Sequence, residues 1–96
     1  MIEIYIYEKT GGFAENKDIA KEIRTTKIIP ALELNQKIVI DFDKVDSATQ
    51  SFIHAMISSV IRSKGISVLD KISFRNCNET IKKIINIVVE YMQESA

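Results

Sequence analysis

The residues of this chain most able to do chemistry follow a short apolar run in segment 37–56, KIVIDFDKVDSATQSFIHAM. Asp41 and Asp43 are spaced as in Mg²⁺-dependent phosphatases, where the first aspartate attacks phosphorus and the second handles the proton of the leaving group. Such a site needs a further acidic pair to complete the metal coordination, whereas segment 71–78 contains lysine, arginine and asparagine but no acid. A small phosphatase or phosphotransferase is therefore an alternative function rather than the preferred one.

Two other groupings are better explained by structure than by chemistry. Asp41, Asp43 and Asp46 resemble a bare cation site, but carboxylates solvated in a surface turn are the commoner arrangement. His54 follows Ser51 by three positions on a predicted helix, so a hydrogen bond between them is feasible. No third group orients the imidazole, and no glycine-rich turn forms an oxyanion hole.

Cys77 stands at the predicted start of a helix, where the helix N-terminus can lower the pKa of a thiol. A lone cysteine there is more often a small, partly buried apolar residue. The chain has no set of cysteines and histidines for zinc, and Gly11-Gly12 is too short to cradle a phosphate. We expect no catalytic residue, no metal site and no cofactor.

Three neighbouring polar residues, Thr49, Gln50 and Ser51, stand where the acidic turn passes into a helical pattern. The first turn of a helix has unpaired N–H groups and a partial positive charge, so a hydroxyl there can cap the helix. A phosphoryl group on such a hydroxyl is stabilised by the same groups and adds about −1.5 to −2 charge. Two interpretations stay open: a helix cap, or a switch in which phosphorylation weakens binding to a partner.

Three segments have the composition of strands. Isoleucines at alternate positions predict a strand over residues 2–7, which Gly11-Gly12 terminates. Residues 38–40, Ile-Val-Ile, predict a strand covered on both faces. Residues 72–74 predict a third strand, and residues 41–50 form the turn after the second.

Helical patterns fill the intervals between these strands. The first begins at a cap, Asn16 or Asp18, and is kinked or split by Pro30. The second runs from Ser51, with apolar positions at helical spacing. The third follows a cap at Asn78.

The resulting β-α-β-α-β-α order predicts an α/β fold, with a mainly parallel sheet flanked by helices in a single domain over residues 1–96. Hydrophobic residues make up 46% and charged residues 27%, as in ordinary globular proteins. Thirteen basic and thirteen acidic residues give a net charge of zero, so nothing points to nucleic acid or an anionic membrane. One cysteine and the absence of a long apolar segment favour a cytoplasmic protein. An exposed sheet edge makes a homodimer an option.

The segment IVIDFDKVDSATQSFIHAM resembles the signature of STAS domains, in which a strand ends in aspartate and Asp-Ser-Ser-Gly opens a helix. GGFAENKDIAKEIR, IIPALE and FRNCNETIKKIINIVVEY extend the likeness to a bacterial STAS-like family of unknown function. Alignment on Asp41 places Ser51 at the phosphoacceptor serine. Thr49, Gln50 and Phe52 depart from the Asp, Ser and Gly of the signature.

The resemblance implies partner switching, as in anti-anti-sigma factors. Those proteins bind an ATP-binding serine kinase of the histidine-kinase-like ATPase superfamily and are released when the loop serine is phosphorylated. By this likeness Ser51 is the candidate phosphoacceptor and Asp41 is the acid at the strand end. The predicted partner-binding loop comprises Asp43, Asp46, Ser47, Thr49, Gln50, Ser51 and Phe52.

The sequence therefore predicts a non-catalytic STAS-like interaction domain that uses this loop and the exposed face of the following helix. One alternative is the phosphatase with Asp41 and Asp43. The other is a domain that senses a small ligand, in a cavity lined by Phe42, Phe52 and Met56.

Overall fold

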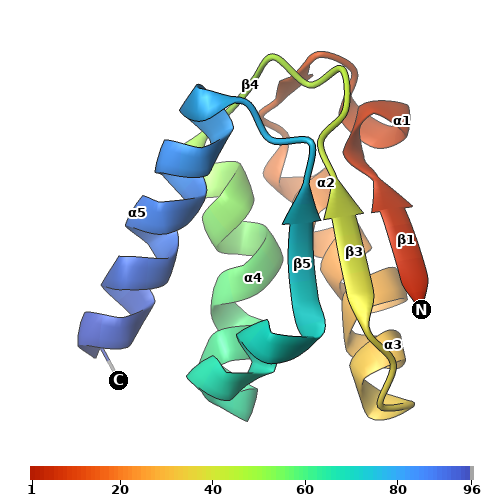
Figure 1. Ribbon diagram of the computed structural model, residues 1–96, viewed down its shortest axis with the longest axis vertical. Coiled ribbons are helices and arrows are strands. Elements are labelled where there is room, and N and C mark those ends of the chain that lie inside the picture. The colour runs from red at the N-terminus through yellow and green to blue at the C-terminus, as the bar shows by residue number, and fades with distance from the viewer. Residues whose placement is uncertain (96) are drawn as a thin grey trace.

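The structure is a computed structural model that describes residues 1–95, so the last residue of the predicted domain lies outside the described part. Its main sheet has three parallel strands, β1 (Ile2–Tyr5), β3 (Ile38–Asp41) and β5 (Ile72–Arg75), in the order β1-β3-β5 (Figure 1). This arrangement confirms the prediction of a small α/β fold with a parallel sheet.

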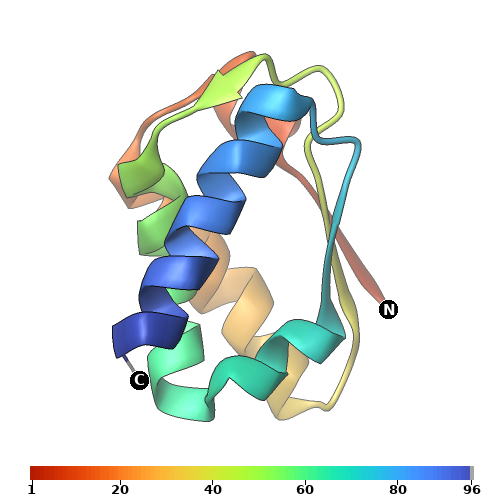
Figure 2. The same cartoon turned by 60° about the vertical axis from the view of Figure 1, so that its left-hand side comes forward.

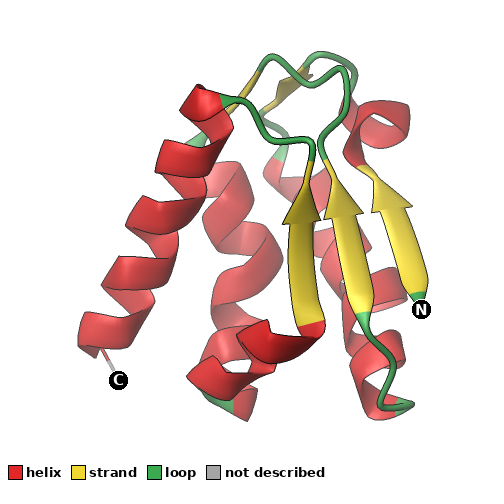
Figure 3. Cartoon of the chain, viewed as in Figure 1, coloured by secondary structure: helices red, strands yellow, loops and turns green. Residues whose placement is uncertain are grey.

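The helices lie behind this sheet in Figures 1 and 3 and to one side of it in Figure 2. They comprise α2 (Lys17–Ile23), the π-helical turn η1 (Arg24–Ile28), α3 (Ile29–Glu33), α4 (Gln50–Lys64), the 3-10 helix η2 (Ile66–Lys71) and α5 (Glu79–Ser95). Helix α4 packs between α2 and α5. The main helices therefore leave one face of the sheet without a helical layer.

The central strand β3 is buried along all of its residues, as the apolar run predicted. On the open face, however, no helix supplies the cover. Val39, which is only 8% exposed, lies in register between Glu3 on β1 and Ser73 on β5. Neighbouring side chains shield it there, so the predicted cover on both faces of the strand comes from helices on one face and from side chains on the other.

Local hydrogen bonds explain where the helices begin and break. Asn16 caps α2 by accepting from the amide of Asp18, and Asn78 accepts from the amide of Ile81 in α5, so both predicted caps are confirmed. Pro30 has no N–H, which removes one i→i−4 bond. The helix passes through a π-helical turn just before it, and the predicted break is therefore confirmed.

The N-terminal segment differs from the sequence prediction. Strand β1 ends at Tyr5, and residues Ile6–Thr10 form a short helix, α1. Ile6 is fully buried, and the hydroxyl of Thr10 donates to its carbonyl at 3.2 Å. Alternation of isoleucines cannot distinguish a strand from a strand followed by one helical turn, because Ile6 is buried in both.

A second, two-stranded parallel sheet joins β2 (Phe13–Ala14) to β4 (Ser47–Ala48) at one end of the molecule. The sequence did not predict it, because each strand has only two residues. Its effect is to tie the turn after β3 to the N-terminal segment. Among residues 1–95, no helix combines the length and the apolar composition needed to cross a bilayer.

Candidate functional site

The acidic turn predicted as the working part of the chain lies at the carboxyl end of β3, at the top of Figure 1. Parallel strands bring their carboxyl ends to one edge of the sheet, so the residues after β3 and β5 meet there. We refer to residues 42–49 as the β3–α4 loop.

Asp41 is the anchor of this loop. Its Oδ1 accepts from the amide of Asp43 at 2.8 Å and from Nδ2 of Asn76 at 3.0 Å, while Oδ2 accepts from Nε of Arg75 at 3.1 Å. The residue is only 4% exposed. Both oxygens therefore accept hydrogen bonds, from three residues in two segments of the chain.

The charge of Asp41 is retained despite its burial. Burial alone raises the pKa of a carboxyl group, but hydrogen bonds from Asn76, from the Asp43 amide and from Arg75, with the charge of Arg75, outweigh that effect. The pKa of Asp41 is consequently lower than its ordinary value. The carboxylate is a buried anion held in place by these hydrogen bonds.

Other segments hold the rest of the loop. The amides of Asp46 and Ser47 donate to the carbonyl of Gly12 at 2.8 and 3.3 Å. The amide of Thr49 donates to Ala14, and Nδ2 of Asn78 donates to the carbonyl of Asp46 at 2.7 Å. The β3–α4 loop is thus cross-linked to the N-terminal segment and to the start of α5.

Thr49, rather than Ser51, caps α4. Oγ1 of Thr49 accepts from the amide of Phe52 at 3.1 Å, so the capping interpretation of the hydroxyl cluster is confirmed for this residue. Ser51 is exposed in the first turn of α4, and its side chain makes no hydrogen bond within residues 1–95. Its hydroxyl is accessible from solvent.

Most side chains of the predicted partner-binding loop reach solvent. Asp43, Asp46, Gln50 and Ser51 are exposed, and Ser47 and Thr49 are partly exposed. Phe52 is the exception, since it is 0% exposed. Its side chain anchors α4 in the core. A buried ring neither contacts a partner nor obstructs one, so the inclusion of Phe52 in the loop surface was wrong.

Two exposed aromatic residues beside the loop were missed by sequence reasoning. Phe13 is 49% exposed and pairs in register with Ser47, so both side chains point to the same face of the small sheet. Tyr7 is 44% exposed, and Nζ of Lys44 lies 5.8 Å from its ring centroid. The signal for Phe13 was an aromatic residue directly after Gly11-Gly12, which was interpreted only as a break.

His54 and Cys77 are the residues that were considered for nucleophilic catalysis, and the structure shows the surroundings of each. Nδ1 of His54 lies 3.3 Å from Oγ of Ser58, and its ring meets Tyr91 edge-on at 6.4 Å between centroids. The feasible hydrogen bond between His54 and Ser51 is not formed among the described residues. Burial raises the pKa of the Cys77 thiol, an effect that the charge of Lys82 only partly offsets. Cys77 is partly buried, which agrees with the preferred interpretation of this residue as a small apolar side chain.

The ligand cavity considered around Phe42, Phe52 and Met56 is filled. All three side chains are fully buried in the continuous hydrophobic core and pack together with other apolar residues. Within residues 1–95, no three His, Cys, Asp or Glu side chains are grouped so that they could hold a metal ion.

Comparison with known proteins gives one match. The family model described as a STAS-like domain of unknown function (DUF4325) matches residues 20–82, a span that contains β3, the β3–α4 loop, α4 and β5. Neither the curated proteins nor the solved structures gave a match. With an anchored acidic loop leading into a capped helix, and a family match over more than half of its length, the chain belongs to the STAS-like domains of this family.

Proposed function

We propose that this protein is a non-catalytic interaction domain that binds a protein partner through its β3–α4 loop and the adjoining aromatic residues. This docking surface consists of the exposed or partly exposed side chains around the loop, namely Tyr7, Phe13, Asp43, Lys44, Asp46, Ser47, Gln50 and Ser51. The observation that carries the proposal is that these accessible side chains stand on or beside a loop that hydrogen bonds from other segments hold in place.

A fixed loop favours binding because little conformational entropy is lost when a partner docks. Phe13 and Tyr7 offer apolar area of the kind that dominates the energy of protein interfaces. Asp43, Lys44 and Asp46 surround them with charges of both signs, which set partner choice and orientation. A buried Asp41 with no free oxygen suits the role of a support for this surface.

Regulation through Ser51 extends the same proposal. The Ser51 hydroxyl is exposed at the start of a 15-residue helix that Thr49 already caps, so modification of Ser51 leaves the cap intact. A phosphate there would be stabilised by the helix N-terminus and would add negative charge to the docking surface. Membership of a STAS-like family supports an ATP-binding serine kinase of the histidine-kinase-like superfamily as the partner, in a cytoplasmic partner-switching pair.

The docking surface is tested by calorimetric titration of the protein with each histidine-kinase-like ATPase from the same genome. Phe13→Ser and Asp46→Arg are expected to weaken binding about tenfold or more. Leu34→Ser is the matched control, because Leu34 is 72% exposed but lies beyond α3 at the opposite end of β3. Equal effects of the three variants would reject this surface.

Phosphorylation is tested separately by incubating the protein with the bound ATPase and Mg·ATP and measuring the intact mass. The expected product carries one phosphate, which is absent from Ser51→Ala but present on Ser47→Ala. A phosphate at another residue, or none with an ATPase that binds, would remove the switch and leave the docking surface standing.

A further inference from the structure

Within residues 1–95, both outer edges of the main sheet, those of β1 and β5, lack a partner strand, and the β5 edge borders a groove. The carbonyl of Arg75 accepts from the amide of Phe42 at 2.9 Å, so the backbone groups of Arg75 face β3. Because these groups alternate in direction along a strand, those of Ile72 and Phe74 face away from β3. No strand within residues 1–95 pairs with that edge.

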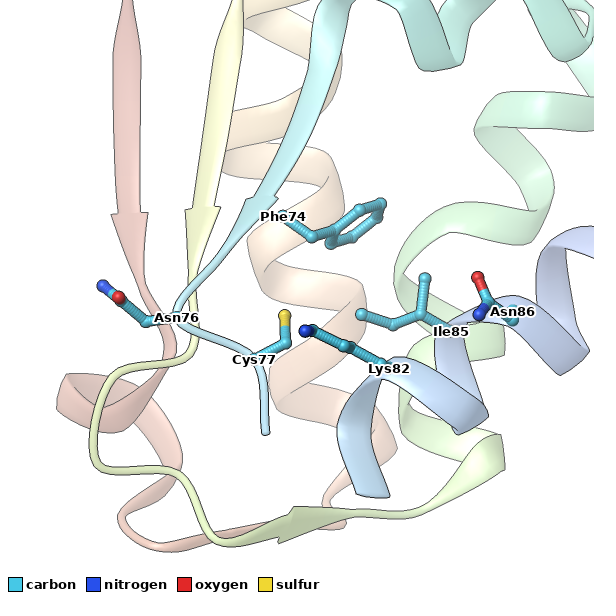
Figure 4. A pocket seen from close by; sticks show the side chains of 6 residues that line it. All are labelled: Phe74, Asn76, Cys77, Lys82, Ile85 and Asn86. Carbon is cyan, nitrogen blue, oxygen red and sulfur yellow. The ribbon is translucent and has the colours of Figure 1, made fainter. Parts of the chain in front are cut away.

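A groove runs beside this edge. It has a volume of about 480 Å³ and lies between β5 and α5 (Figure 4). Its lining residues are Phe74, Asn76, Cys77, Lys82, Ile85 and Asn86. Figure 4 shows the Phe74 ring extending from β5 toward Ile85, which gives the groove an apolar floor between a strand edge and a helix.

The charge that lines the groove is positive. Among the described residues that line it, Lys82 is the one charged side chain and none is a carboxylate. The ion pair of Lys82 with Glu79 spans 3.9 Å between exposed side chains, so it is weak and easily exchanged. The groove therefore complements an occupant that has both apolar and carboxylate groups.

We propose that the groove binds an extended peptide, which adds a fourth strand to the sheet beside β5. Its backbone would pair with the N–H and carbonyl of Phe74 and with the carbonyl of Ile72, whose own N–H already donates to the carbonyl of Leu69. An apolar side chain would lie between Phe74 and Ile85, and a carboxylate would meet Lys82. This mode of recognition obtains affinity from backbone hydrogen bonds and specificity from alternate side chains. The site is separate from the docking surface and stands whether or not that surface has a partner.

The test begins with a random peptide library displayed on phage and selected against the immobilised full-length protein. Enriched peptides are synthesised and titrated in solution. They are expected to share an apolar residue and a nearby acid, and Lys82→Glu should weaken their binding about tenfold or more. Lys83→Glu, an exposed change on the same helix outside the groove, should leave binding within about twofold.

Three further measurements test the added strand, the contact with Lys82 and the position of the peptide in the groove. A bound peptide should slow amide hydrogen exchange at Phe74, because that N–H becomes paired. A peptide with lysine in place of its acid should bind Lys82→Glu better than it binds the unaltered protein. Asn86→Trp, which fills the groove from an exposed position, should abolish binding without loss of the folded circular dichroism spectrum.

Several outcomes would overturn the proposal: no enriched peptide, enriched peptides that bind Lys82→Glu and Asn86→Trp normally, or unchanged exchange at Phe74 in the complex. Protection of Phe74 that rises with protein concentration in the absence of peptide would also overturn it. That result would assign the edge to a second copy of the chain.

Discussion

Nη2 of Arg75 lies 3.0 Å from Oδ2 of Asp41, on neighbouring strands whose register places these two residues opposite each other. The Asp41 side chain is 5% exposed and the Arg75 side chain 44% exposed. The pair therefore joins a buried acid to a cation that remains half in water. Because Asp41 also receives the Asp43 amide, the interaction fixes the start of the β3–α4 loop.

Replacing the buried acid should destabilise the fold. We expect Asp41→Asn to lower the free energy of unfolding by about 1.5–3 kcal/mol, because several hydrogen bonds to a charged group are lost or weakened. Urea denaturation measures the difference. The control Asp43→Asn changes an exposed side chain and should cost no more than about 0.5 kcal/mol. Equal losses would show that Asp41 does not carry this role.

The same anchor predicts a particular acid sensitivity. The folded-state pKa of Asp41 is lowered, so its contribution to stability is complete above its unfolded pKa of about 3.9. That contribution is lost as the pH falls through the folded-state pKa. The stability difference between the unaltered protein and Asp41→Asn should therefore shrink below about pH 4. A difference that stayed constant from pH 7 to pH 2.5 would contradict this account.

Removal of the Thr49 hydroxyl and removal of the Ser51 hydroxyl, both at the start of α4, should change the stability of the fold by different amounts. Thr49→Ala is expected to cost about 1 kcal/mol, since the amide of Phe52 loses its acceptor, and Thr49→Ser should restore most of the loss. Ser51→Ala should change stability by less than about 0.5 kcal/mol, because Ser51 makes no side-chain bond in the described part of the chain. Thermal unfolding of the three variants separates the cap from the candidate phosphoacceptor.

Two glycines allow a test of backbone conformation without crowding. Gly65 ends α4 at φ 86°, and a Cβ there would meet no atom within 4 Å. Gly65→Ala should therefore cost about 1–3 kcal/mol from backbone strain alone. At Gly12 φ is not positive, and a Cβ would lie 3.4 Å from Oδ2 of Asp46. Gly12→Ala should cost less, and denaturant midpoints would reveal any reversal of that order.

Patterns within one segment predicted most of the fold. The apolar strand 38–40, the caps Asn16 and Asn78 and the break at Pro30 all depend on local chemistry, and the structure confirms them. The pairing of β2 with β4 could not be predicted, because two-residue strands have no period. The face of the sheet without helices could not be predicted, because an apolar run such as Ile-Val-Ile does not show whether helices or neighbouring side chains cover each face.

The candidate site was predicted only in part for the same reason. The sequence singled out Asp41 and the exposed positions after it, but not the residues that hold Asp41. Arg75 ends β5 and Asn76 follows it, and both reach Asp41 only because β3 and β5 are parallel neighbours. Their lack of acidity argued against a metal site, whereas their capacity to donate hydrogen bonds was the informative property.

Each pairing in the main sheet joins residues from distant parts of the chain, Ile2 with Ile38 and Ile38 with Ile72. During synthesis, β1 must leave the ribosome well before the strand that pairs with it. The donors that anchor Asp41 emerge later still, with Arg75 and Asn76. The proposed docking surface is therefore set in its final shape only after residues 75–78 have been translated, and a nascent chain that lacks them cannot present it.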